Sequence, residues 1–178
     1  KIKSKNPALV FMVSYVVDAI TLMRQSKEIG LSPKAFLGGG AGFTTAQFLA
    51  QKEISNLVMS STQWTDDVNW PGAADFAKRY TAKYKKEPTY HAACAYAAMM
   101  VMAETASKSD GDRDKTRNAL KAGQWNGIMG EVKFADYAGF TNQNNHQMLV
   151  QQVQDGKYET VFPAKFATKK PVYPFKWK

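Results

Sequence analysis

The stretch Asn6–Thr44, NPALVFMVSYVVDAITLMRQSKEIGLSPKAFLGGGAGFT, decides the fold of the chain. Ala8–Val13 is an unbroken apolar run of strand length, which is typical of a parallel strand buried on both faces. A helical period follows from Val16, and Gly30 supplies the left-handed residue that ends such a helix. Ala35–Leu37 then starts a second short strand. The pattern predicts a β-α-β unit.

A glycine loop, Gly38–Phe43, follows the second predicted strand. A right-handed β-α-β unit brings this loop and Ser14–Tyr15, which follow the first strand, to the same edge of the sheet. A third strand is predicted at Leu57–Met59, and its end at Ser60–Trp64 should reach that edge too. Ligands bind at the carboxyl edge of open α/β sheets, so we expect the functional site there.

The rest of the chain alternates between helical and extended patterns. Thr44 and Thr45 are expected to cap a single helix that continues to Ile54. Tyr90–Ala106 is apolar nearly all round and is therefore expected to be buried, with its methionines as core filler. Ala135–Asn145 is polar and is expected to be irregular. Asp155–Gly156, between two apolar runs, predicts a β-hairpin.

The composition is that of a globular protein, with 178 residues, 44% hydrophobic residues and a net charge of +9. The lysines are spread along the chain without an arginine-rich helix or an RNP-like motif, which argues against a nucleic-acid partner. No apolar run approaches the roughly 18 residues of a membrane-spanning helix. The single cysteine, Cys94, cannot form an internal disulfide. Because the chain opens at Lys1 with neither an initiator Met nor a visible signal peptide, we expect an internal start.

The glycine loop does not match a nucleotide-binding fingerprint. A G-x-G-x-x-G motif fails because the sixth position is Phe43 when counted from Gly38 and Thr45 when counted from Gly40. The Gly-Lys-Ser/Thr of a P-loop is missing as well. Two interpretations remain: a flexible connection, or a close approach of bare backbone N–H groups to a small ligand.

No group of residues in the sequence predicts catalysis, a metal site or a cofactor. His91 and Cys94 lie three apart on a predicted helix, but no third ligand or orienting Asn or Asp lies near them in sequence. Asp66 and Asp67 are neighbours in a loop, where two carboxylates rarely converge. Five aromatic side chains, three of them near the predicted sheet edge, fit either the wall of a small-molecule pocket or core packing. They are Tyr15, Phe43, Trp64, Trp70 and Tyr90.

An ordered set of motifs resembles a known family. They are VSYVVDAITLMRQSKEIGLSPKAFLGGG, STQW, P-x-Y-H-A-A-x-A-Y-A-A at Pro88–Ala98, G-x-V-K-F at Gly130–Phe134, QMLVQQVQDGKYETVFP and KPVYP. Together they resemble the C-terminal half of a type I periplasmic binding protein, and in particular the branched-chain amino acid (Leu/Ile/Val) receptors of ABC transporters. The resemblance covers essentially the whole chain in the correct order.

This resemblance implies two α/β lobes of Rossmann-like parallel sheets, joined by three crossovers, with a ligand trapped between the lobes by hinge closure. Residues 1–60 would belong to lobe 2 and form a wall of the ligand cleft. Residues 61–140 would be a mostly helical part of lobe 1, and residues 141–178 a crossover and tail hairpin packed on lobe 2. The N-terminal half of such a receptor would be missing, so we expect the chain alone to be unstable unless that half is supplied.

The resemblance also implies where a ligand binds. Tyr15 matches a tyrosine with which the amino-acid receptors contact their ligand, and Ser14 lies beside it. The acidic residue that holds the ligand's ammonium group falls on Gly40 here. A buried ammonium without a carboxylate partner is costly, which favours a ligand without that amine, such as a carboxylate, an aromatic acid or an amide. The candidate ligand-binding residues are Ser14, Tyr15, Gly39, Gly40, Ala41, Phe43, Trp64 and Tyr90.

The implied function is that of a substrate-binding component of an ABC importer, without catalysis. Its partners would be a small-molecule ligand, a membrane permease and the missing N-terminal half. It would be periplasmic, or extracellular and lipid-anchored in a Gram-positive organism. Two alternatives stay open: a ligand-sensing regulatory domain of the same fold, and a small flavodoxin-like α/β enzyme that depends on His91 or Cys94.

Overall fold

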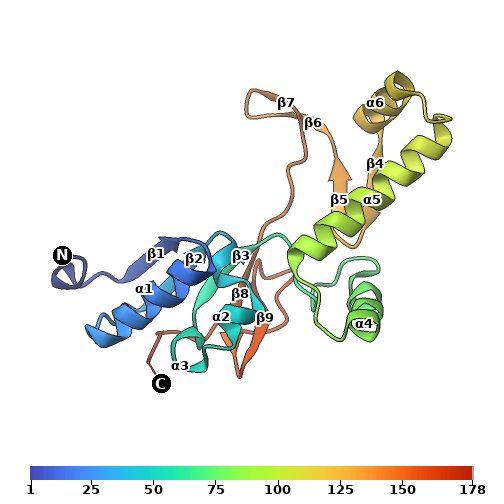
Figure 1. The fold of residues 1–178 in the computed structure, drawn as a ribbon. Coiled ribbons are helices and arrows are strands. Elements are labelled where there is room, and N and C mark those ends of the chain that lie inside the picture. Colours follow the sequence, from blue (N-terminus) through green and yellow to red (C-terminus); the bar gives the residue numbers. More distant parts are fainter. Residues whose placement is uncertain (178) are drawn as a thin grey trace. The chain divides into compact units, whose positions relative to one another are not determined.

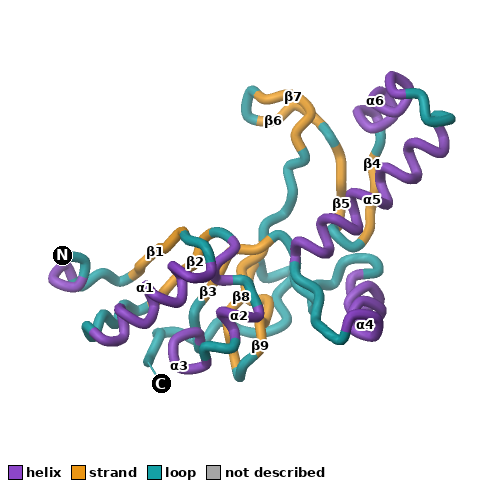
Figure 2. Tube along the Cα trace, viewed as in Figure 1, coloured by secondary structure: helices purple, strands orange, loops and turns teal. Residues whose placement is uncertain are grey.

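The computed structural model describes residues 1–177, so Lys178, the last residue of the predicted tail segment, lies outside it. The chain divides into two compact units, shown by element in Figure 1 and by secondary structure in Figure 2. The first unit comprises Lys1–Asp67 and the chain from Met148 onward, and the second comprises Val68–Gln147. The unit boundaries therefore follow residues 67 and 147, whereas the segments predicted from the sequence end at 60 and 140.

The first unit is built on a five-stranded sheet with the order β1-β2-β3-β8-β9. The first three strands are parallel, and the last two are antiparallel to their neighbours. The α/β class, the parallel β-α-β unit and the tail hairpin are thereby confirmed. The strands are β1 (Leu9–Val13), β2 (Ala35–Gly39), β3 (Met59–Thr62), β8 (Leu149–Gln154) and β9 (Lys157–Phe162).

The helices of the first unit include α1 (Val16–Glu28), which connects β1 to β2. The single helix predicted to continue to Ile54 is wrong, because the chain forms two one-turn helices, α2 (Ala46–Leu49) and α3 (Lys52–Ser55). Thr45 does cap the first of them, since its side chain accepts a hydrogen bond from the Phe48 N–H at 3.1 Å. Short 3-10 turns lie at Lys3–Lys5 and Ala41–Phe43.

Strand β3 begins later than predicted. Leu57 has a φ of 63°, in the left-handed region that a strand cannot continue, so the extended segment starts at Met59. The carboxyl end of β3 still lies at the predicted carboxyl edge of the sheet, because Leu37 pairs with Met59 and Gly38 with Ser60 in parallel register.

The core of the first unit lies on one face of the sheet, beneath α1, and the other face is open at β1. Val10 is buried, whereas Leu9, Phe11 and Val13 on the opposite face are 53%, 58% and 69% exposed. The prediction that this strand is buried on both faces is therefore wrong for the described chain. The buried cluster consists of Val10, Ala19, Met23, Leu31, Phe36, Phe43, Phe48, Ile54, Val58 and Phe175.

The C-terminal tail is fastened to the first unit by aromatic packing and by side-chain hydrogen bonds. The ring of Phe175 packs edge-on against Phe36, with centroids 4.9 Å apart. The indole N–H of Trp177 donates to the Leu31 carbonyl at 3.0 Å. Gln152, fully buried, donates to the Val172 carbonyl and accepts from the Val172 N–H, at 2.9 and 2.8 Å. The proline-containing tail is thus a structured part of the unit.

The second unit is mostly helical and carries two separate β-ribbons. The prediction that Ala135–Asn145 is irregular is wrong, because this segment forms a hairpin about Ala138–Gly139. Both turn residues have positive φ, 51° and 84°, which suits the twist of a tight hairpin. The elements are α4 (Ala73–Tyr84), α5 (Tyr90–Lys108), α6 (Arg113–Ala122), β4 (Gln124–Gly127), β5 (Gly130–Lys133), β6 (Ala135–Tyr137) and β7 (Phe140–Gln143).

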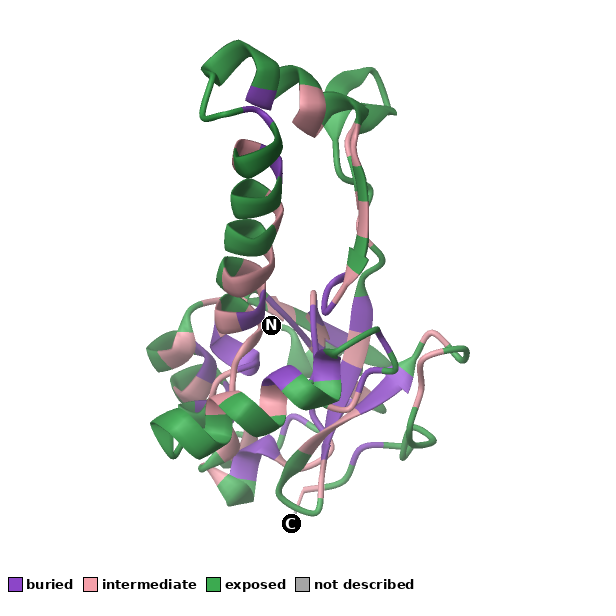
Figure 3. Cartoon of the chain, turned by 90° about the vertical axis from the view of Figure 1, so that its right-hand side faces the viewer, coloured by how far each residue is buried: buried purple, intermediate pink, exposed green. Residues whose placement is uncertain are grey.

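Helix α5 is far more exposed than its composition predicts (Figure 3). Its only buried residues are Ala93 and Thr105. Met99, Met100 and Met102 are 68%, 53% and 45% exposed, so the prediction that they fill a core is wrong for the described chain. Within residues 1–177, none of the helices combines the length and apolarity that crossing a membrane requires.

Candidate functional site

The two predicted segments of the sheet edge are in direct contact. The Ser14 N–H donates to the Gly39 carbonyl at 3.4 Å, and the Gly42 N–H donates to the Ser14 carbonyl at 3.1 Å. The end of β1, the start of α1 and the glycine loop after β2 therefore form one backbone-linked rim. This is the arrangement that a right-handed β-α-β unit dictates.

Gly42 makes this contact possible because it has no side chain. A Cβ at this position would lie 2.5 Å from the Ser14 carbonyl oxygen and 2.6 Å from that of Tyr15. Backbone atoms cannot yield to such an overlap, so any other residue would push the loop away from the start of α1. The glycine loop is thus a close-packed element and not a flexible connection.

Gly40 lies at the exposed tip of the rim in a conformation that suits only glycine. Its φ is 79° and its ψ is 177°. A residue with a Cβ that adopts this conformation is destabilised by about 1–3 kcal/mol. A carboxylate-bearing side chain at position 40 would therefore require a different backbone. Ala41 beside it is half-buried, and Gly39 is buried beneath the side chains of Phe11 and Val13.

Tyr15 is the most exposed candidate side chain, at 78%. It occupies the N-cap position of α1, where its side chain makes no capping hydrogen bond. The neighbouring Ser14 hydroxyl oxygen is buried and has no hydrogen-bond partner among residues 1–177. Ser14 therefore contributes its backbone to the rim, and Tyr15 contributes an accessible ring and hydroxyl.

Phe43 and Trp64 are placed in the interior, although the sequence prediction assigned both to the ligand. They are only 1% and 2% exposed. The Phe43 ring lies against Gly38, where a Cβ would come within 2.2 Å of it, and against Phe48 at a centroid distance of 5.2 Å. The Phe43 side chain therefore supports the loop from below.

Tyr158 of β9 fixes the far end of the glycine loop. Its hydroxyl lies 3.0 Å from the Phe43 carbonyl oxygen and 2.9 Å from that of Thr45, and its burial raises its pKa. Ser60 also donates to the Phe43 carbonyl, at 3.3 Å. Tyr158 could not be predicted from the sequence, because it lies 115 residues from Phe43. An aromatic residue in a predicted hairpin strand does not by itself indicate a partner in a distant loop.

Asp67 anchors the point at which the chain leaves the first unit. Its carboxylate accepts hydrogen bonds from the Thr160 N–H at 3.0 Å, from the Thr160 hydroxyl at 2.6 Å and from the Thr168 hydroxyl. Burial raises the pKa of Asp67, but the hydrogen bonds from Thr160, Thr168 and Thr65 outweigh it and hold the pKa below its usual value. Asp66 is exposed, so the two carboxylates have separate environments.

A family model described as "Periplasmic binding protein" matches residues 1–157 of the chain. The chain belongs to the periplasmic binding protein family. The resemblance seen in the sequence motifs is thereby confirmed.

Curated relatives of this periplasmic binding protein chain include receptors named for branched-chain amino acids. Leu/Ile/Val-binding protein homolog 8 of Brucella abortus (strain 2308) is 30% identical over 183 residues, covering 96% of this chain and 44% of the relative. Homolog 7 of Brucella melitensis is 28% identical over 170 residues, covering 91% and 43%. The chain thus spans less than half the length of the relatives it matches.

Solved structures of other binding proteins share the fold. The leucine binding protein LivK of Thermotoga maritima aligns with a TM-score of 0.74 and 24% identity, over 88% of this chain and 44% of that one. LivJ of Streptococcus pneumoniae, in complex with isoleucine, gives 0.71 and 23%, over 88% and 45%. A solute binding protein of R. palustris in complex with benzoate gives 0.71 and 17%, over 90% and 44%.

The residues considered for catalysis do not form a reactive pair in this binding-protein chain. No hydrogen bond joins His91 to Cys94 within residues 1–177, and burial raises the pKa of the Cys94 thiol, which opposes a reactive thiolate. The Tyr90 ring stacks on His91 at 3.9 Å, in the second unit. The described residues contain no cluster of three or more metal-ligating side chains.

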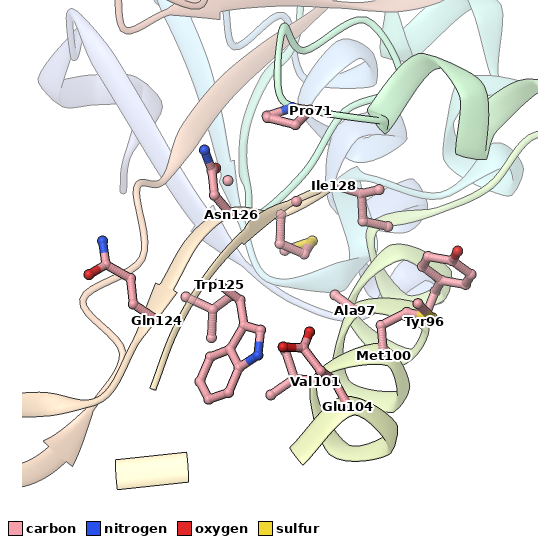
Figure 4. Close-up of a pocket in the computed structure, with 14 residues that line it drawn as sticks. Pro71, Tyr96, Ala97, Met100, Val101, Glu104, Gln124, Trp125, Asn126 and Ile128 are labelled. Atoms are coloured by element: carbon pink, nitrogen blue, oxygen red, sulfur yellow. The ribbon is translucent and has the colours of Figure 1, made fainter. Parts of the chain in front are cut away.

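A cavity of about 450 Å³ opens in the second unit between α5 and the β4–β5 ribbon (Figure 4). Tyr96, Ala97, Met100, Val101 and Glu104 line it from one stripe of the helix, opposite Trp125. Glu104 is already paired with Lys108 at 2.6 Å. Met99 and Met102, which point away from this stripe of α5, are also exposed, so the helix is apolar on more than the side that lines the cavity.

Proposed function

We propose that the chain is the C-terminal part of the substrate-binding component of an ABC importer, of the Leu/Ile/Val receptor type. It binds a small organic solute at the carboxyl edge of the sheet in the first unit. The contact between Ser14–Tyr15 and Gly39–Gly42, at the ends of two parallel strands, carries this proposal. Tyr15 stands exposed on that rim, ready to contact a ligand. The names of the curated relatives support the same function.

The rim favours a ligand that presents a hydrogen-bond acceptor. Tyr15, Gly40 and Ala41 carry no carboxylate, and the backbone conformation of Gly40 leaves no place for one without rearrangement. An ammonium group here would have no charged partner at the position that the amino-acid receptors use. A carboxylate, an aromatic acid or an amide fits better, since backbone N–H groups and the positive end of α1 favour acceptors. Benzoate in the R. palustris protein is one such ligand on this fold.

The receptor mechanism is a population shift. In the proposed protein the first unit belongs to lobe 2, the second unit is part of lobe 1, and an N-terminal half supplies the remainder. A solute that bridges the lobes favours the closed form, which a membrane permease then recognises. The receptor works in the periplasm, or outside the cell on a lipid anchor, without catalysing a reaction.

A thermal-shift screen of the complete receptor tests this function. The panel contains benzoate, phenylacetate, benzamide, propionamide and leucine. We expect at least one carboxylate or amide to raise the melting temperature more than leucine does, because a ligand at about 100 times its Kd adds about 2.7 kcal/mol of stability. Stabilisation by leucine alone would contradict the ligand class. A flat response to all five would contradict the binding function for these solute classes.

A further inference from the structure

Three separate segments of the first unit meet at the carboxylate of Asp67, the last residue of that unit before the chain enters the second. The carboxylate accepts hydrogen bonds from the Thr160 N–H and hydroxyl, at 3.0 and 2.6 Å, and from the Thr168 hydroxyl. The Thr65 hydroxyl lies 2.7 Å from that of Thr160. We call these four residues the exit clamp, because they tie the departing chain, strand β9 and the tail together.

The exit clamp is largely sheltered from water. Thr65 and Thr160 are 4% and 0% exposed, and Asp67 is half-buried. The Thr160 carbonyl is held as well, since it accepts from the N–H groups of Thr168 and Lys169 at 2.9 and 3.2 Å. Hydrogen bonds to an ionised carboxylate are stronger than neutral ones, and partial burial strengthens them further. The clamp therefore fixes the position of Asp67 on β9.

Strand β9 also anchors the ligand rim. Tyr158 precedes Thr160 by two residues and therefore lies on the same side of the strand. Its hydroxyl contacts the Phe43 and Thr45 carbonyl oxygens at 3.0 and 2.9 Å, at the far end of the glycine loop. One short strand thus holds both the loop of the proposed ligand site and the residue at which the chain leaves the first unit.

The next anchor of the chain, Trp70, lies in the second unit. A Cβ on Gly130 would come within 3.2 Å of the Trp70 ring, and the centroid of the His146 ring lies 5.4 Å from that of Trp70. Trp70 is 8% exposed, and the range Val68–Asn69 is all that separates it from Asp67. A change of angle between the units must therefore be taken up, in this connection, by a few backbone bonds.

We infer that Asp67 is a positioning residue for solute binding, because it confines the bending of this connection to Val68–Asn69 and thereby sets how readily the receptor closes. The inference rests on the proposed function, in which a solute favours the closed form. A connection held at both ends has few conformations to lose on closing. Without the clamp, the chain from Thr65 onward joins the flexible connection, and the fraction of receptor that is competent to close falls.

A clamp that only stabilises the first unit would behave differently. Its loss would lower the melting temperature and leave the affinity of the folded receptor unchanged. Loss of a positioning residue instead lowers the competent fraction, so the apparent Kd rises by the same factor for every solute. Removing a residue that touches the solute, as proposed for Tyr15, weakens different solutes by different factors.

Calorimetric titration of the complete receptor tests the inference, with the two best-bound compounds among benzoate, phenylacetate, benzamide, propionamide and leucine. Asp67→Asn replaces an accepting oxygen by an NH2 group and removes the charge. We expect the affinity to fall at least about fivefold, and by the same factor for both compounds. Phe36→Leu is the control, because it loosens the buried core and not the clamp, and it should leave both affinities unchanged. Unchanged affinity of Asp67→Asn, or different factors for the two compounds, would overturn the inference.

A measurement without solute keeps the test decisive. Spin labels at Glu28→Cys in the first unit and Lys115→Cys in the second, both exposed positions, report the distance between the units in a Cys94→Ser receptor. The distance distribution should be broader in Asp67→Asn than in wild type, and unchanged in Phe36→Leu. No broadening, or the same broadening in both variants, would overturn the inference. A receptor that binds none of the five compounds contradicts the proposed function, whereas this result depends on the clamp alone.

A second variant serves if Asp67→Asn does not fold. Thr160→Val keeps the shape of the side chain but removes the hydroxyl that donates to Asp67. The same equal loss of affinity and the same broadening are expected, and their absence would overturn the inference in the same way.

Discussion

The amide of Gly42 donates a hydrogen bond to the carbonyl of Ser14 at 3.1 Å, and no side chain can fit at position 42. This one contact joins the glycine loop after β2 to the residues that begin α1. It fixes the position of the rim that carries Tyr15. The geometry of the proposed binding site therefore depends on the absence of a Cβ at Gly42.

Gly42→Ala should therefore both destabilise the receptor and weaken solute binding. The added methyl group would overlap two carbonyl oxygens, and overpacking of this kind costs about 1–3 kcal/mol. Thermal unfolding and solute titration measure the two effects. Gly127→Ala is the control, because a Cβ there meets nothing within 4 Å. Equal behaviour of the two variants would contradict the close approach.

Gly40→Glu should not restore binding of an α-amino acid. Its backbone, at φ 79° and ψ 177°, penalises any Cβ by about 1–3 kcal/mol, so the new carboxylate comes with a distorted loop. Gly40→Ala, which adds the strain without the charge, should lose a similar amount of stability in chemical denaturation. A Gly40→Glu variant of unchanged stability that gains leucine binding would show that the loop accepts an amine-binding acid.

Tyr158→Phe should loosen the glycine loop. The change removes the hydroxyl shared by the Phe43 and Thr45 carbonyls, and losing such a hydrogen bond costs about 1 kcal/mol. Hydrogen exchange should become faster at the amides of residues 42–48. The exposed Tyr137, changed to Phe, should leave the exchange unaltered. Unchanged exchange in both variants would show that Tyr158 does not hold the loop.

Asp67→Asn should remove a pH-dependent part of the stability. Because the folded pKa of Asp67 is lowered, the ionised carboxylate stabilises the fold above its unfolded pKa of about 3.9, and this contribution is lost as pH falls through the folded value. The stability difference between wild type and Asp67→Asn should thus be largest above about pH 4 and shrink in more acidic solution. A difference that is independent of pH would contradict the assignment.

Local patterns predicted much of the first unit. The apolar run before Ser14, the helical period after it and the turn signal at Asp155–Gly156 each specify one element from adjacent residues. The parallel pairing of β1 with β2 was predicted from the helical segment that connects them, and this pairing brings Ser14 to the glycine loop. These features depend on short stretches of chain, which a sequence displays directly.

Features that depend on distant or absent neighbours could not be predicted in the same way. Tyr158 reaches the loop across 115 residues, and nothing near it in sequence indicates that partner. Apolar patterns on β1 and α5 indicate burial, but burial requires a covering surface that the described chain does not contain. The aromatic residues Phe43 and Trp64 fitted a pocket wall and a core equally well, and only the fold placed them inside.

Calorimetric titration of the complete receptor, wild type against Tyr15→Ala, tests the central claim most directly. The titrant is the compound that stabilises the wild-type receptor most in the thermal-shift screen. Since Tyr15 is 78% exposed, the variant should keep its stability within about 0.5 kcal/mol while its affinity falls at least about tenfold, which is a loss of about 1.4 kcal/mol of binding energy. A folded Tyr15→Ala receptor that binds this compound as tightly as wild type would contradict a ligand site at the carboxyl end of β1.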